Sequence, residues 1–226
     1  GSFDCAIGRD NMGGNWIGAG LMVMKDQAGV LDLARSKVML SGAYVLKLGE
    51  NNYISAGLQG AYNQRSIDYS KMLVDAQITP SGFNTSLPHY ENVDLIKKNF
   101  MELNAGLIWG YRPSDFLDVY SGVAFMHANS PKDALVADES TIGMRSVLHS
   151  GATIILNDKL MLQPALIMQT QKGVGELILG GAVGRSLAPG KQDVTRIAYA
   201  GVWYRNDDAV VPYVGVEIES WKVGLS

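Results

Sequence analysis

Three histidines are the residues of this chain best suited to proton transfer or metal binding: His89, His127 and His149. Such histidines usually occur in a recognisable pattern, such as HExxH, or accompany a GxSxG nucleophile turn, and the sequence contains neither pattern nor a P-loop. An isolated histidine in a strand more often lines a polar interior or rim. We therefore expect His127, followed by Asn129 and Pro131, to end a strand and fix its loop.

Two other groupings could hold an ion. The glycine-rich stretch 180–184 would need a following helix to cradle a phosphate, but an alternating apolar segment surrounds it. Asp133, Asp138 and Glu139 could bind a cation, but their spacing matches no calcium-binding loop. The single cysteine, Cys5, has no partner at a metal-binding spacing. The sequence thus predicts no catalytic residues, no cofactor and no metal, and the chain is expected not to be an enzyme.

Charged residues inside the apolar segments could also form a site. Buried charges must be paired, so acids and bases on one face of neighbouring strands should form a network. The expected inner polar network consists of Lys37, Arg65, Glu102, Arg112, Glu176, Arg185, Arg196 and Glu217. Arg185 fits least well, because its parity is opposite to that of Glu176. The same residues could instead form a selective pathway for small solutes.

The elements that must position these residues are about a dozen alternating segments separated by turn-forming residues. In one of them Ile54, Ala56 and Leu58 alternate with Ser55 and Gly57. One face of such a strand suits lipid and the other suits water. The expected strands are 3–8, 15–25, 35–48, 52–67, 100–112, 116–128, 145–156, 159–171, 175–186, 194–205, 209–219 and a last one from Trp221. Pro164 should disturb its strand locally, because proline cannot donate a ladder hydrogen bond.

Composition narrows the fold class. Hydrophobic residues make up 47% of the 226 residues, charged residues only 18%, and the net charge is -3. No apolar run approaches the roughly 18 residues that a membrane-spanning helix needs, and no basic stripe indicates nucleic-acid binding. A soluble sandwich would place more Lys and Glu on its polar face. We predict an all-β, antiparallel up-and-down transmembrane β-barrel in a single domain, residues 1–226.

Loop lengths and aromatic residues fit this prediction. The long connection 68–98 and the intermediate connection 130–144 follow the fourth and sixth expected strands, which puts both on one rim. Aromatic side chains near strand ends are expected to anchor the barrel at the lipid interface. They are Trp16, Tyr44, Tyr62, Trp109, Tyr111, Tyr199, Trp203 and Tyr204.

Several short stretches, in order along nearly the whole chain, resemble the PorP/SprF family of Bacteroidota outer-membrane proteins. They include the runs 16–21 (WIGAGL), 40–44 (LSGAY), 58–62 (LQGAY), 64–68 (QRSID), 103–107 (LNAGL), 111–114 (YRPS), 127–131 (HANSP), 147–152 (VLHSGA) and 162–164 (LQP). Members of the family are usually longer. The resemblance therefore implies a barrel of about 14 strands, of which this chain would lack an initial segment and the closing strands.

The resemblance also implies a role: an outer-membrane component of the type IX secretion and gliding-motility apparatus. Such a barrel would lie in outer-membrane lipid and serve as a docking scaffold. Its partners would be periplasmic peptidoglycan-binding proteins or the C-terminal domains of secreted adhesins. Two alternatives remain open. One is a small-solute porin; the other is an outer-membrane hydrolase that would depend on His127 or His149.

Overall fold

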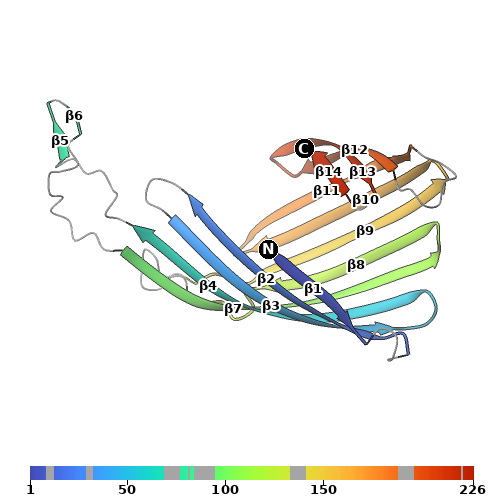
Figure 1. Cartoon of the computed structure of the whole chain (residues 1–226), viewed down its shortest axis with the longest axis horizontal. Coiled ribbons are helices and arrows are strands. Elements are labelled where there is room, and N and C mark those ends of the chain that lie inside the picture. Colours follow the sequence, from blue (N-terminus) through green and yellow to red (C-terminus); the bar gives the residue numbers. More distant parts are fainter. Residues whose placement is uncertain are drawn as a thin grey trace.

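A computed structural model describes residues 1–8, 13–28, 33–68, 77–80, 82–83, 95–132, 141–187, 196–219 and 221–226. Twelve strands form one antiparallel sheet that curls strongly, as Figure 1 shows, with each strand beside its neighbour in sequence. They are β1 (Ser2–Ile7), β2 (Trp16–Ala28), β3 (Leu33–Lys47), β4 (Asn52–Asp68), β7 (Leu95–Ser114), β8 (Leu117–Met126), β9 (Arg145–Asn157), β10 (Leu160–Gln171), β11 (Val174–Ser186), β12 (Arg196–Arg205), β13 (Ala209–Ile218) and β14 (Trp221–Leu225). The predicted all-β, up-and-down architecture is confirmed.

The two faces of the sheet differ in polarity, as the alternation predicts. On β4, Leu58 is 72% exposed on the outer face, whereas Asn63, on the inner face, is fully buried. On β7, Met101 and Leu103 are exposed while Glu102 between them is buried. An apolar outer face with a polar inner face is the arrangement of a barrel that lies in lipid. In the described part of the chain, no helix is long and apolar enough to cross a membrane.

The strand boundaries differ from the sequence prediction in two places. β7 begins at Leu95, not near residue 100. β4 pairs with β7 as far as Asp68, so the first, mostly polar residues of β7 also belong to the ladder. A small hairpin of β5 (Ile78–Thr79) and β6 (Gly82–Phe83) was not predicted. It lies apart from the sheet in Figure 1. Two paired residues a strand are too few to show an alternating pattern.

Pro164 interrupts a ladder, as predicted. Leu162 of β10 pairs with Ile154 of β9, and Ala165 pairs with Gly151. Gln163 and Pro164, which lie between them, have no β9 partner. The pairing of Pro164 with Gly181 on the other side, in β11, is kept. The proline therefore disturbs one neighbouring strand and leaves the other in register.

Glycines on the inner face make room for aromatic rings of the adjacent strand. A Cβ on Gly151 would lie 2.6 Å from the hydroxyl oxygen of Tyr120, and one on Gly122 would lie 2.6 Å from Nε2 of His149. Tyr120 and His149 also contact each other, with ring centroids 5.8 Å apart. Each ring lies close to a glycine of the adjacent strand, and both occupy part of the space enclosed by the curved sheet.

The antiparallel order divides the connections between two rims. The connections 69–94 and 127–144 follow β4 and β8, the fourth and sixth strands of the sheet, so both leave the same rim, which we call the long-connection rim. The opposite rim carries, among others, the short turns 48–51, 115–116 and 158–159. The predicted placement of the two long connections on one side is therefore confirmed.

The sheet has two free edges in the described residues. β1 pairs only with β2 and β14 only with β13, so the first and last strands do not bond to each other. Both edge strands are exposed along their length. An uncovered edge of this kind presents unpaired N–H and C=O groups to another strand.

Candidate functional site

A buried ion pair lies at the centre of the largest polar cluster on the inner face. Nζ of Lys37, on β3, donates to both carboxylate oxygens of Glu102, on β7, at 2.9 and 3.1 Å. The Lys37 side chain is 12% exposed and that of Glu102 only 3%. Both residues belong to the predicted inner network, and alternation along β3 and β7 turns them to the same face. The attraction between the two charges is stronger here than at a surface, but taking both out of water is costly, so it is the loss of one partner alone that should be strongly destabilising.

Two amide side chains bond the carboxylate, and a third is bonded to one of them. Asn63 donates to Glu102 at 3.1 Å, and Asn104 donates to its other oxygen at 3.0 Å. The same Asn104 amide donates to Gln59 at 2.9 Å. Glu102 is thus bonded by neighbours on β3, β4 and β7, which ties three strands together through one buried anion.

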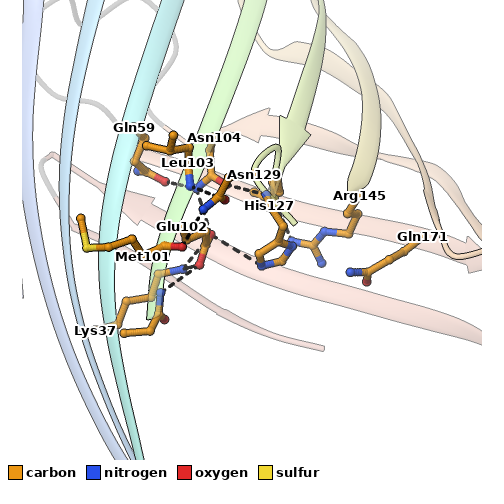
Figure 2. A network of polar contacts seen from close by, with 12 residues as sticks. Lys37, Gln59, Met101, Glu102, Leu103, Asn104, His127, Asn129, Arg145 and Gln171 are labelled. Carbon is orange, nitrogen blue, oxygen red and sulfur yellow. Dashed lines mark hydrogen bonds and ion pairs between the residues drawn. The ribbon is translucent and has the colours of Figure 1, made fainter. Parts of the chain in front are cut away.

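The cluster extends to the start of a long connection. His127 directly follows β8 in a left-handed backbone conformation, with φ 56°, and its Nε2 lies 3.6 Å from Glu102. Its backbone N–H donates to Asn104 at 2.9 Å. Two residues later, Asn129 accepts from the N–H of Leu103 at 3.0 Å and donates to the carbonyl of Met101 at 2.8 Å. Figure 2 shows how these contacts fasten the first residues of the 127–144 connection to β7. His127 ends the strand and holds its loop, as predicted.

Two smaller polar groups lie on β10 to β14, one at each end of β12. Tyr199 donates to Glu217 at 2.8 Å, and Lys222 Nζ lies 3.6 Å from the same carboxylate and 4.3 Å from the Tyr199 ring centroid. Glu176 contacts Arg205 and Gln169. Glu176 and Glu217 are therefore partnered, although by residues other than the arginines that the sequence suggested.

The structure places four of the predicted basic residues differently from Lys37. Arg65 lies with its guanidinium carbon 5.8 Å from the centre of the Phe100 ring. Arg112 is wrong as an interior residue: its side chain is 60% exposed and lies 4.0 Å from Asp115 in the turn after β7. The ladder of β7 with β8 is irregular after Tyr111, which breaks the alternation on which the prediction depended.

Arg185 and Arg196 are also wrong as members of the inner network. Both are exposed and lie on the outer parity of their strands, Arg185 alternating with buried Gly184. Within the described residues neither forms an ion pair. Near a rim, a long arginine side chain reaches water from the outer face, so parity alone does not decide its environment.

The aromatic residues divide between the two faces. Tyr44, Tyr62, Trp109 and Tyr204 are exposed on the outer face, and Tyr111 stacks on Trp109 with ring centroids 6.0 Å apart. Tyr44 and the stacked pair lie toward the rim with the short turns, and Tyr204 lies toward the long-connection rim. Interfacial aromatic belts at both ends of a barrel have this distribution.

Three predicted anchors face inward instead. Tyr199 is 6% exposed and bonded to Glu217. Trp16 lines an inner cavity of about 690 Å³, and Trp203 lines another of about 420 Å³. The first cavity also borders the Glu102 cluster, since Gln59 and Asn104 belong to both. These three rings are assigned wrongly because a strand end identifies depth in the bilayer, whereas the face depends on parity.

The remaining candidates carry no visible site. His149 packs at a tilt against Tyr120 on the inner face, and the 180–184 glycines lie within β11, as expected of a strand. His89, Asp133, Asp138 and Glu139 lie outside the described residues. In the part of the chain that is described, no three His, Cys, Asp or Glu side chains come together as a metal site would require.

Sequence reasoning missed the amides of the cluster. Asn63, Asn104 and Gln59 were seen only as polar members of a strand face, although Asn63 is fully buried. They could have been found because they lie on the same face as Glu102: Asn104 on β7 itself, and Asn63 and Gln59 on the adjacent β4.

Comparison with known proteins agrees with this fold. The model of a family described as type IX secretion system membrane protein PorP/SprF matches residues 2–226. A comparison with curated protein sequences finds no significant match. The crystal structure of the toluene transporter TbuX from Ralstonia pickettii is similar over 95% of this chain and 71% of its own, with a TM-score of 0.53 and 10% identity. A FadL homologue from Pseudomonas aeruginosa is similar over 89% and 68%, with a TM-score of 0.44 and 9% identity.

Proposed function

Because the chain belongs to the PorP/SprF family of type IX secretion system membrane proteins, we propose that this outer-membrane β-barrel protein is a non-enzymatic docking scaffold of that system. Its partners would be periplasmic peptidoglycan-binding proteins or the C-terminal domains of secreted adhesins. Family membership supports association with the secretion machinery. The docking role depends on how the barrel presents its loops.

One observation carries the proposal: the start of a long connection is fastened to the barrel wall, through exposed hydrogen bonds of Asn129 and through His127, which joins the Glu102 cluster. The Asn129 side chain bonds the N–H of Leu103 and the carbonyl of Met101 on β7. The backbone N–H of His127 bonds the side chain of Asn104, which in turn bonds Glu102. Loops recognise partners best when a rigid scaffold fixes their roots. The long-connection rim is therefore the docking face.

Site-specific photo-crosslinking in native membranes tests this proposal. A photoreactive amino acid at Thr79, in the hairpin β5–β6 of the 69–94 connection, should capture cell-envelope proteins of the secretion machinery. The matched control places the same group at Lys159, in the short turn on the opposite rim. Equal capture at both positions, or capture at Lys159 alone, would contradict docking at the long-connection rim.

A porin is the competing function, and planar-bilayer conductance separates the two. Rings such as Tyr120 and His149 occupy part of the inner space, so a scaffold should pass little current. A hydrolase would show ester or peptide turnover that disappears when His127 or His149 is replaced. Neither reaction is expected, because His127 contacts the buried carboxylate and His149 packs against a tyrosine ring.

We also propose that strands beyond the twelve described here cover β1 and β14. The free edges of both strands support this, since an exposed edge invites pairing with another chain. Hydrogen exchange of the protein in its native membrane should find the edge amides of β1 and β14 protected. Rapid exchange along both strands would contradict the proposal.

A further inference from the structure

The inner wall below the long-connection rim carries more basic than acidic side chains. Arg35, Lys37 and Arg145 all lie close enough to His127 to act on it electrostatically. Three acids lie in reach of this group: Glu102 is bonded to Lys37, Glu176 is bonded to Arg205 and also acts on Arg145 electrostatically, and Asp26, opposite Arg35 in the β2–β3 ladder, is exposed. In the described structure neither Arg35 nor Arg145 has a carboxylate within ion-pair distance.

The same arginines have buried donors that bond to nothing. Nε of Arg35 and Nε of Arg145 are shielded from solvent and lack a hydrogen-bond partner; Nδ1 of His127 is equally shielded and unpartnered, and it is a donor only when that nitrogen carries a proton. A terminal nitrogen of Arg145 contacts the thioether sulfur of Met126 at 2.6 Å, and thioethers are weak acceptors. Arg35 reaches Asn63 only at 3.5 Å. Buried donors without acceptors are costly, and native proteins rarely leave them so.

The side chains of Arg145 and His127 are neighbours on the inner wall. Figure 2 shows the Arg145 guanidinium beside the His127 imidazole, with Glu102 on the far side of the ring and Gln171 beyond the arginine. Gln171 is turned away to donate to the carbonyl of Gly143 at 2.8 Å. The inner cavity of about 690 Å³ lies next to this place: Met126, which Arg145 contacts, is part of its lining, whereas Arg145 and His127 are not.

We propose that Arg145 and His127 form an anion-binding site on the inner wall, for the carboxylate or phosphate group of a ligand that enters the barrel. A guanidinium binds such oxyanions through two parallel N–H donors, and the imidazole adds a third once the anion and Glu102, on its two sides, hold the ring in its doubly protonated form. Arg35, on the same inner wall, adds positive charge to the site. The proposal concerns the inner wall and is independent of docking at the rim.

Isothermal titration calorimetry of the detergent-solubilised protein tests it with two probes. One is inorganic phosphate; the other is a short Asp-Glu peptide with acetylated and amidated ends, which offers carboxylates only. At least one should bind, and Arg145→Gln should weaken that binding about tenfold or more, the equivalent of one charge-assisted hydrogen bond. Arg112→Gln, which removes an exposed guanidinium at the opposite rim, is the matched control and should bind as the unaltered protein does.

Each outcome decides the question. Loss of binding in Arg145→Gln but not in Arg112→Gln supports the site, and the probe that binds identifies carboxylate or phosphate as its ligand. Binding of neither probe, or equal binding by both variants, overturns it. If Arg145→Gln does not fold, Arg145→Lys keeps the charge without the paired donors and should still bind several-fold more weakly. Undiminished binding by that variant also refutes the site.

Discussion

Replacing Glu102 with glutamine should destabilise the barrel more than any single change at its surface. The carboxylate accepts two hydrogen bonds from Lys37 and one each from Asn63 and Asn104. A glutamine would leave the ammonium of Lys37, itself only 12% exposed, without a counter-charge, and would turn an amide donor toward donors. Removing one partner of a buried ion pair costs about 3–5 kcal/mol.

Urea unfolding followed by tryptophan fluorescence, with the protein in phospholipid vesicles, measures this cost. With a slope of about 2 kcal/mol per molar urea, the midpoint of Glu102→Gln should fall by about 2 M. The double variant Lys37→Met with Glu102→Leu should recover most of the loss, because replacing both charges with apolar groups is often close to neutral. Arg112→Gln, whose ion pair with Asp115 is exposed, should change stability by less than about 1 kcal/mol.

A loss below about 1 kcal/mol for Glu102→Gln would refute the reasoning. It would mean that water screens the pair in spite of its burial, and that the cluster does not hold the strands together. A double variant no more stable than Glu102→Gln would also contradict it, since the cost would then come from packing and not from an unpaired charge.

Three further changes are expected to be measurable in the same unfolding experiment. Gly201→Ala should cost about 1–3 kcal/mol, because its Cβ would lie 2.6 Å from a backbone oxygen of β11, whereas Gly60→Ala, with open space around it, should be nearly neutral. Asn129→Ala should cost about 1 kcal/mol and make the 127–144 connection easier to cleave by protease, because two hydrogen bonds to β7 are lost. Leu58→Arg should cost about 2–4 kcal/mol in lipid, and an effect near zero would place this outer position away from the bilayer centre.

The sequence was sufficient to predict the twelve strands of the sheet, their order and the alternation of their two faces, but not the hairpin β5–β6. The reason is physical: the side-chain period of a strand is two, so Met101 and Leu103 could be assigned to one face and Glu102 to the other without coordinates. The boundaries near rims were harder. Polar residues at the start of β7 carry no such signal, and ladder bonds to β4 place them in the strand.

The candidate site could be predicted only in part. Lys37 and Glu102 were named, but their pairing depends on which strands lie side by side and on register. Arg112 was assigned wrongly to the interior because the ladder is irregular after Tyr111, which alters the alternation of the side chains. Tyr199 failed because an aromatic ring near a strand end fits the lipid interface and the interior equally well until its parity is fixed by neighbours.

The continuous ladder between β4 and β7, which runs from Asn52 paired with Tyr111 to Asp68 paired with Leu95, makes the barrel wall sensitive to misassembly. A slip of β7 by one residue would keep most backbone bonds but exchange the two faces. Glu102 would then point into hydrocarbon, where a carboxylate is strongly disfavoured. The buried charge therefore raises the free energy of a sheet whose register is shifted by one residue, and it leaves the native register as the stable product of insertion.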